Sequence, residues 1–299
     1  MPLAMLLVAL AAFGTTAPAS PPPGWTDGYV LANGIRIHYW RTGGDKPPLV
    51  LAHGSSDDGL CWTNLAKELE ARFDVIMYDA RGHGLSDPPT AADAADVQVE
   101  DLAGLIKELK LQKPVLMGHS MGSAAVAHFA AKYPDVPRAV ILEDPALVRA
   151  APAAGAAAPA TPESRRAAIL ARNNTSQDEL VEGCMKNSPK WGRSECETWA
   201  PSKRRHHPDT ALVATGRRPP MRDLFPKIAA RTLILKADAD AAVKKQNEDV
   251  AALLQSGQIV HITGAGHNVR REGREQTLQV LNAFLASLSP GAGSGAGQD

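Results

Sequence analysis

The chain has 299 residues, of which 44% are apolar, and its 32 Lys and Arg are balanced by 32 Asp and Glu. A formal net charge of zero argues against nucleic acid as the principal partner, because phosphate binding requires an excess of basic residues. The apolar content is sufficient for a sizeable core. No stretch of the sequence is long and apolar enough to span a bilayer, so no transmembrane segment is expected.

The first 24 residues are predicted to form a signal peptide and a proline-rich linker. Residues 3–13 are an apolar run of signal-peptide length, and residues 17–19 (Ala-Pro-Ala) match a cleavage site. No Lys or Arg precedes the run, which weakens the pattern. We expect a secreted or periplasmic protein, with a cytoplasmic location as the alternative.

Short apolar runs alternate with helical patterns along most of the chain. Two β-rich runs flank Asn33-Gly34, which is the strongest short signal for a hairpin. Further strands are predicted at residues 48–52, 74–78, 139–142, 232–235 and 258–262, and just after Pro114. Helices are predicted at residues 62–71, 97–109, 123–131, 242–254 and 272–288. This alternation indicates an α/β fold with a mostly parallel sheet covered by helices on both faces.

The alternation stops between Pro145 and Pro226. Residues 150–160 form a low-complexity Ala/Pro/Gly stretch, and residues 161–164 can begin a helix. Polar segments follow, with a basic cluster at residues 203–207 that is expected to be a solvated face, or alternatively to attract an anionic substrate. We predict a helical insertion here, and a disordered tail at residues 290–299.

The three cysteines are Cys61, Cys184 and Cys196. They are too few for a disulfide scaffold and do not have the spacing of a zinc site. Cys184 and Cys196 could pair in an exported protein, and three free, packed thiols fit the sequence equally well. No metal and no cofactor are expected.

The clearest chemical signal is Gly118-His119-Ser120-Met121-Gly122, between a predicted strand and a predicted helix. This is the arrangement of a nucleophile elbow. A sharp turn holds the serine in a strained backbone conformation, which requires small residues two positions on either side. The Ser120 hydroxyl would project clear of the sheet, above a helix N-terminus that favours negative charge. His119 is expected to point away from it.

A serine nucleophile needs a base and a carboxylate that orients the base. His267 follows the last predicted strand in a loop with Gly264 and Gly266, so we assign it as the base. Asp144, Asp238 and Asp240 also follow predicted strands, where the ligand crevice of an open α/β sheet lies. The residues alone leave the acid open among these three.

Four motifs together resemble the α/β-hydrolase superfamily: His53-Gly54, the run at residues 79–86, the elbow, and Gly266-His267. The resemblance implies an eight-stranded sheet and a Ser-Asp-His triad. It implies a core at residues 25–144 and 227–289, with a cap or lid at residues 145–226 after the sixth strand. Family spacing places the acid at Asp240, and some relatives use the position of Asp144. The resemblance also implies that the run at residues 79–86 is a turn that supports the neighbouring loops and takes no part in the chemistry.

The same reasoning predicts an oxyanion hole formed by the backbone N–H groups of Met121 and Ser55, with Ser56 as an alternative. Three tryptophans are candidate walls of an apolar substrate pocket, and each also fits simple core packing: Trp62, Trp191 and Trp199. Asp57 and Asp58 are predicted to be solvated loop charges.

A serine at the elbow argues against epoxide hydrolase and haloalkane dehalogenase chemistry, which in this superfamily uses an elbow carboxylate. We therefore expect hydrolysis of a small-molecule ester or lactone with an apolar moiety, through an acyl-enzyme on Ser120. Hydrolysis of a carbon–carbon bond and perhydrolysis use the same triad and are alternatives. A non-catalytic binding protein is a further alternative, because fold does not dictate function.

Overall fold

The computed structural model describes residues 21–90, 92–148, 160–212 and 218–288. The predicted signal peptide up to residue 20, nearly all of the low-complexity stretch and the predicted C-terminal tail lie outside these ranges. Across the described part of the chain, no helix combines the length and apolar character needed to cross a membrane.

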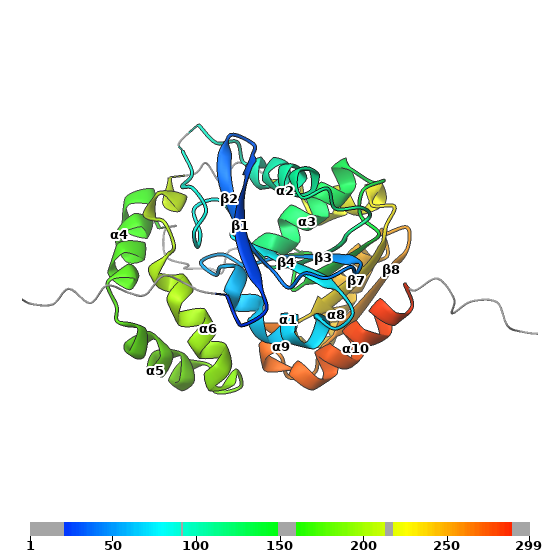
Figure 1. Cartoon of the computed structure of the whole chain (residues 1–299). Coiled ribbons are helices and arrows are strands. Elements are labelled where there is room, and N and C mark those ends of the chain that lie inside the picture. The colour runs from blue at the N-terminus through cyan, green and yellow to red at the C-terminus, as the bar shows by residue number, and fades with distance from the viewer. Residues whose placement is uncertain (1–20, 91, 149–159, 213–217, 289–299) are drawn as a thin grey trace, which may run out of the picture.

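Eight strands form one sheet in the order β1-β2-β4-β3-β5-β6-β7-β8 (Figure 1). The strands are β1 Thr26–Ala32, β2 Ile35–Arg41, β3 Pro48–Ala52, β4 Asp74–Tyr78, β5 Val115–His119, β6 Ala139–Glu143, β7 Arg231–Lys236 and β8 Gly257–His261. The pairs β1–β2 and β2–β4 are antiparallel, and the other pairs are parallel. Asn33 and Gly34 both have positive φ, as a tight hairpin requires. The predicted α/β architecture is confirmed.

Helices cover both faces of this sheet. Alternate residues of β3 point to opposite faces, so Val50 and Ala52 join one hydrophobic cluster while Leu49 and Leu51 join another. The first cluster includes side chains of α2 (Val97–Glu108), α3 (Met121–Lys132) and α8 (Ala241–Ala251). The second includes side chains of α1 (Thr63–Leu69), α9 (Val269–Glu272) and α10 (Arg274–Ala286). The central strands β4, β5 and β6 are buried throughout.

The segment between β6 and β7 is helical, and its helices α4 (Pro162–Asn173), α5 (Gln177–Asn187) and α6 (Gly192–Arg204) lie beside the sheet, at the left of Figure 1. The short α7 (Met221–Leu224) also belongs to this segment. Among the described residues of α4 only Ile169 is buried, and α5 and α6 share a small cluster around Leu180 and Ala200. This helical insertion therefore has little apolar core of its own.

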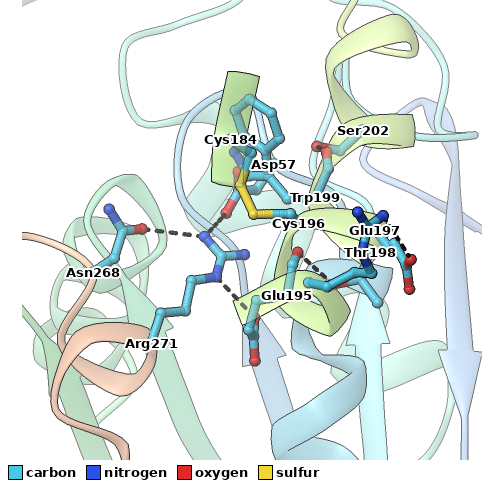
Figure 2. Close-up of a disulfide and its surroundings, with 11 residues drawn as sticks. Asp57, Cys184, Glu195, Cys196, Glu197, Thr198, Trp199, Ser202, Asn268 and Arg271 are labelled. Atoms are coloured by element: carbon cyan, nitrogen blue, oxygen red, sulfur yellow. Dashed lines mark hydrogen bonds and ion pairs between the residues drawn. A yellow bond between two sulfur atoms is a disulfide. The ribbon is translucent and has the colours of Figure 1, made fainter. Parts of the chain in front are cut away.

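A disulfide joins Cys184 on α5 to Cys196 on α6, with 5.7 Å between the two Cα atoms (Figure 2). This decides between the two states that the sequence left open. Cys61 is free and buried in the 3₁₀ turn Gly59–Trp62. Its Sγ lies 3.9 Å from the carbonyl oxygen of Thr198 on α6.

Buried ion pairs hold α6 against the core. Lys203 Nζ lies 2.5 Å from Asp57 Oδ1, and Arg205 Nη2 lies 2.6 Å from Asp58 Oδ2. Lys203 is 2% exposed and Asp58 is 1% exposed. The prediction that Asp57 and Asp58 are solvated was therefore wrong, because each is buried in an ion pair with a residue of the basic cluster. The prediction of a solvated face was also wrong for Lys203, which is buried against Asp57.

Candidate active site

The elbow has the strained geometry that its sequence predicts. Ser120 has φ 51° and ψ −108°, and α3 begins at the next residue. A Cβ added at Gly118 would lie 2.3 Å from the carbonyl oxygen of Gly122, and one added at Gly122 would lie 2.1 Å from that of Ala52. Only glycine fits at both positions, so the neighbouring backbone can approach closely enough to hold the turn.

Asp144 is the carboxylate that the structure places against His267. Asp144 follows β6 with φ 44°, and its Oδ2 lies 2.5 Å from His267 Nδ1. This hydrogen bond raises the pKa of His267 above its ordinary value. Although burial opposes it, the hydrogen bonds from His267 and Lys236 hold the pKa of Asp144 below its ordinary value. The imidazole is thus oriented by a carboxylate that stays ionised.

The placement of the acid at Asp240 was wrong. Asp240 is the N-cap of α8, where its Oδ1 accepts a hydrogen bond from Val243 N at 2.9 Å. Asp238 accepts from Gly264 N at 2.7 Å and pairs with Lys244 at 2.7 Å. Family spacing alone did not show that α8 begins at residue 241. The Asp240 carboxylate caps this helix by accepting from one of its exposed N–H groups and does not contact His267.

Lys236 is a partner of Asp144 that sequence reasoning missed. It is the last residue of β7, and its Nζ donates to Asp144 Oδ1, which also accepts from Ala237 N at 3.2 Å. Each oxygen of the carboxylate therefore has a partner, the base on one side and a lysine on the other. Its place at the end of β7, next to β6 in the sheet, was the available signal.

His119 contacts the loop that carries His267. Its Nε2 lies 3.0 Å from the carbonyl oxygen of His267, and because that oxygen can only accept, Nε2 must donate. Burial lowers the pKa of His119 to about 4, so the ring is neutral at pH 7. The neutral ring therefore serves as a hydrogen-bond donor to the backbone of His267.

Ser120, Asp144 and His267 line one cavity of about 1190 Å³. Its apolar wall comes from the start of α3, the segment after β6, and the segment around α7: Met121, Ala124, Pro145, Leu147, Pro219, Pro220 and Met221. A smaller cavity of about 260 Å³ adjoins it, lined by Ser55 and sharing Met121 and Arg218. The two predicted oxyanion donors therefore border the same small cavity.

The three tryptophans predicted to line the substrate pocket lie elsewhere. Trp62 is completely buried, with the Arg270 guanidinium 3.9 Å from its ring centroid. Trp191 and Trp199 pack edge to face near the disulfide, with ring centroids 6.1 Å apart. Within the described ranges, none of the three lines the cavity that holds Ser120, so this prediction was wrong. Trp62 instead packs in the second cluster of the sheet, and Trp191 and Trp199 pack against the small cluster of α5 and α6.

Comparisons with known proteins agree with the class that this fold and elbow define, an α/β-hydrolase. The family described as "Alpha/beta hydrolase family" matches residues 49–280. The 2-(acetamidomethylene)succinate hydrolase of Mesorhizobium japonicum is 38% identical over 104 residues, which cover 35% of this chain and 37% of that enzyme. The match thus spans little more than a third of the length of that relative.

Two relatives match over most of their length. Serine hydrolase BPHL of Homo sapiens is 26% identical over 303 residues, covering 92% of this chain and 89% of that protein. A thermophilic esterase from Thermogutta terrifontis, whose structure contains bound malate, aligns with a TM-score of 0.68 and 27% identity over 88% of this chain and 99% of that one. The chain belongs to the alpha/beta hydrolase family.

Proposed function

We propose that the chain is a serine hydrolase that cleaves a carboxylic ester or lactone through an acyl-enzyme on Ser120, with His267 as base and Asp144 as acid. The observation that carries this proposal is the shared cavity. The elbow serine and the Asp144–His267 pair come from three separate strand ends, and all three line one space large enough for a small molecule.

The hydrogen bonds of the site assign a role to each proton. Since Nδ1 of His267 is engaged by Asp144, Nε2 is the nitrogen that takes the proton of Ser120 as Oγ attacks the substrate carbonyl carbon. The same proton then passes to the leaving alkoxide as the carbon–oxygen bond breaks. Water attacks the acyl-enzyme, giving one proton to His267, which returns it to Ser120 Oγ as the acid leaves. Asp144 stabilises the imidazolium without taking its proton.

The negative oxygen of each tetrahedral intermediate needs hydrogen-bond donors. The N–H of Met121 is in the first turn of α3, where helical N–H groups lack partners within the helix. Ser55 follows the His53-Gly54 motif and borders the same small cavity as Met121. We assign both backbone N–H groups to the oxyanion hole.

The helical insertion is proposed to act as a cap. Leu147, which precedes its helices, and Met221, the first residue of α7, form part of the apolar wall of the cavity. One relative is named for a succinate derivative, and the structure of another contains malate. These names support a small carboxylic acid derivative as the substrate.

The proposed location is outside the cytoplasm, as a secreted or periplasmic protein. The disulfide between Cys184 and Cys196 supports it, because such bonds persist in oxidising compartments and are rare in the cytosol. The apolar run at residues 3–13 supports it independently.

Active-site labelling tests the proposed function. A fluorophosphonate should label the wild-type chain, and 4-nitrophenyl esters should show a burst of product. Ser120→Ala should abolish labelling and lower turnover by roughly 10⁴–10⁶-fold. Ser164→Ala, at an exposed position on α4, should behave as wild type. A wild-type chain that neither reacts with the probe nor turns over any ester would overturn the proposal.

A further inference from the structure

Basic residues line the small cavity beside the elbow. Three arginines and two histidines line it: Arg81, Arg165, Arg218, His83 and His206. None of the described residues that line it carries a carboxylate. The cavity also borders Met121, the residue after Ser120, and shares Met121 and Arg218 with the larger cavity, so a group bound in it would lie next to the proposed reaction centre.

Two of the arginines have no acidic partner. Arg81 is neutralised, because its Nη2 lies 2.6 Å from Asp101 Oδ1. By contrast, Arg165 donates only to the carbonyl oxygen of Ala211 at 3.3 Å, and Arg218 only to that of Ala95 at 3.2 Å. Neither guanidinium lies within 4 Å of a carboxylate in the described ranges. Their positive charges are therefore available to a ligand.

The adjacent Arg166 shows what a structural arginine on the same helix looks like. Its Nε lies 3.1 Å from Asp209 Oδ1, and it does not line either cavity. Protein atoms packed around Arg218 lower its pKa, although the residue as a whole stays solvent accessible. A partly desolvated cation without a counter-ion is unfavourable, and a bound anion would remove that cost.

The histidines do not supply the positive charge. Burial lowers the pKa of His206 to about 4 and holds the pKa of His83 well below its ordinary value. Both rings are therefore neutral near pH 7. The charge at the cavity comes from the guanidinium groups, which stay protonated across the working range of pH.

We propose that this cavity binds a carboxylate of the substrate, held by Arg165 and Arg218, so that the enzyme prefers half-esters or related monoacyl derivatives of dicarboxylic acids. The preference rests on the proposed acyl chemistry at Ser120. Arg218 lines both cavities, so it would contact the carboxylate on the side that faces the reacting carbonyl. Arg165, which lies on α4 and also lines the small cavity, would contact the same carboxylate. Guanidinium groups suit this role because they can bind a carboxylate through two parallel hydrogen bonds.

Charge-matched ester pairs test the preference. The 4-nitrophenyl half-esters of succinate, glutarate and adipate are compared with the same compounds whose free carboxylate is methylated, with the rate in Ser120→Ala subtracted. Wild type should favour at least one half-ester in kcat/KM. Arg218→Gln and Arg165→Gln should each lower that value by roughly 10-fold or more and leave the methylated ester unchanged. Arg166→Gln is the control and should change neither.

Equal rates for both members of every pair in wild type would overturn the proposal, as would equal losses on both members in Arg218→Gln. A binding arm keeps this result separate from the acyl chemistry. Succinate binding to Ser120→Ala, measured by calorimetry, should weaken in the Arg218→Gln background and not in the Arg166→Gln background. Succinate binding without Ser120-dependent turnover of any ester would contradict the proposed function alone. No succinate binding would contradict the subsite.

Discussion

The sheet edge that carries the triad and the helical insertion beside it are held in place by different forces. Ser120 and Asp144 follow β5 and β6, strands buried along their whole length between two hydrophobic clusters. The insertion buries few apolar side chains and depends on a disulfide and on ion pairs to the core. The residues of the proposed triad therefore lie at the ends of strands that are fixed by apolar packing. Much of the cavity wall lies near the helical insertion, which is fixed by the disulfide and by ion pairs.

Arg271 connects the two regions. It lies on α9, which begins two residues after His267. Its guanidinium donates hydrogen bonds to the carboxylates of Asp57 at 3.3 Å and Glu195 at 3.0 Å (Figure 2). Glu195 is next to Cys196 on α6, so one buried cation bonds the loop after β3 and the disulfide-linked helix. The contrast between the two regions can be tested by breaking each in turn.

The largest effect is expected at the triad acid. Asp144→Asn should lower kcat by roughly 10⁴-fold, because an amide cannot stabilise the imidazolium of His267. Asp240→Asn should leave kcat nearly unchanged, since Asn caps a helix about as well as Asp. Ester kinetics on the two variants decide the matter, with circular dichroism as a check on folding. A large loss in Asp240→Asn with none in Asp144→Asn would reverse the assignment.

The next effect concerns the buried ion pair between the insertion and the core. Lys203→Met should destabilise the protein by about 3 kcal/mol, the lower end of the range for breaking a buried ion pair, because it removes the closer of two cations from buried Asp57 and leaves Arg271 at 3.3 Å as its partner. Urea unfolding measures this. Arg193→Met is the matched control on α6, because its pair with Glu197 is exposed, and it should change stability little. Similar unfolding midpoints for the two variants would mean that charge does not hold this helix.

Loss of the disulfide should act on the insertion alone. In the chain-entropy account, replacing both Cys184 and Cys196 by Ser should destabilise the segment by about 3 kcal/mol. We expect increased amide hydrogen exchange in α5 and α6 and unchanged exchange in β5 and β6. A reductant should make the wild type resemble the double variant and leave that variant unaffected. Increased exchange throughout the sheet would show that the two regions unfold together.

The smallest effect is a shift in the pH profile. His267 must be neutral to act as base, so activity rises with pH through the pKa of His267, which the Asp144 hydrogen bond raises. The positive charge of Lys236 has the opposite effect and lowers the pKa of His267. Lys236→Met should therefore move the acidic limb of kcat/KM to higher pH, and Lys236→Arg should restore it. A profile in Lys236→Met that is unmoved or displaced to lower pH would exclude this role.

The sequence predicted the core well because its signals are local. Alternating strands and helices, the Asn33-Gly34 turn and the two elbow glycines each follow from backbone sterics or from periodic burial. His267 could be proposed as the base because it follows the last strand. The acid could not, since three aspartates follow strands and their partners depend on distant residues such as Lys236 and Val243.

The insertion could not be predicted in the same way. Asp57 and Lys203 are 146 residues apart, and each alone resembles a solvated charge. Only their contact in the folded chain explains why both are buried. The tryptophans were misplaced for a related reason, because large apolar rings are equally suited to a substrate pocket and to a core.

The burial of Cys61 has a consequence for the chemistry of the other two cysteines. Its sulfur lies near α6, yet burial raises the pKa of the thiol to about 12. At pH 7 roughly one molecule in 10⁵ would carry the thiolate, the form that attacks a disulfide. Exchange between Cys61 and the Cys184–Cys196 bond is therefore suppressed once the core has formed. Mispairing is confined to the unfolded chain, and alkylation of Cys61 would report the opening of the fold.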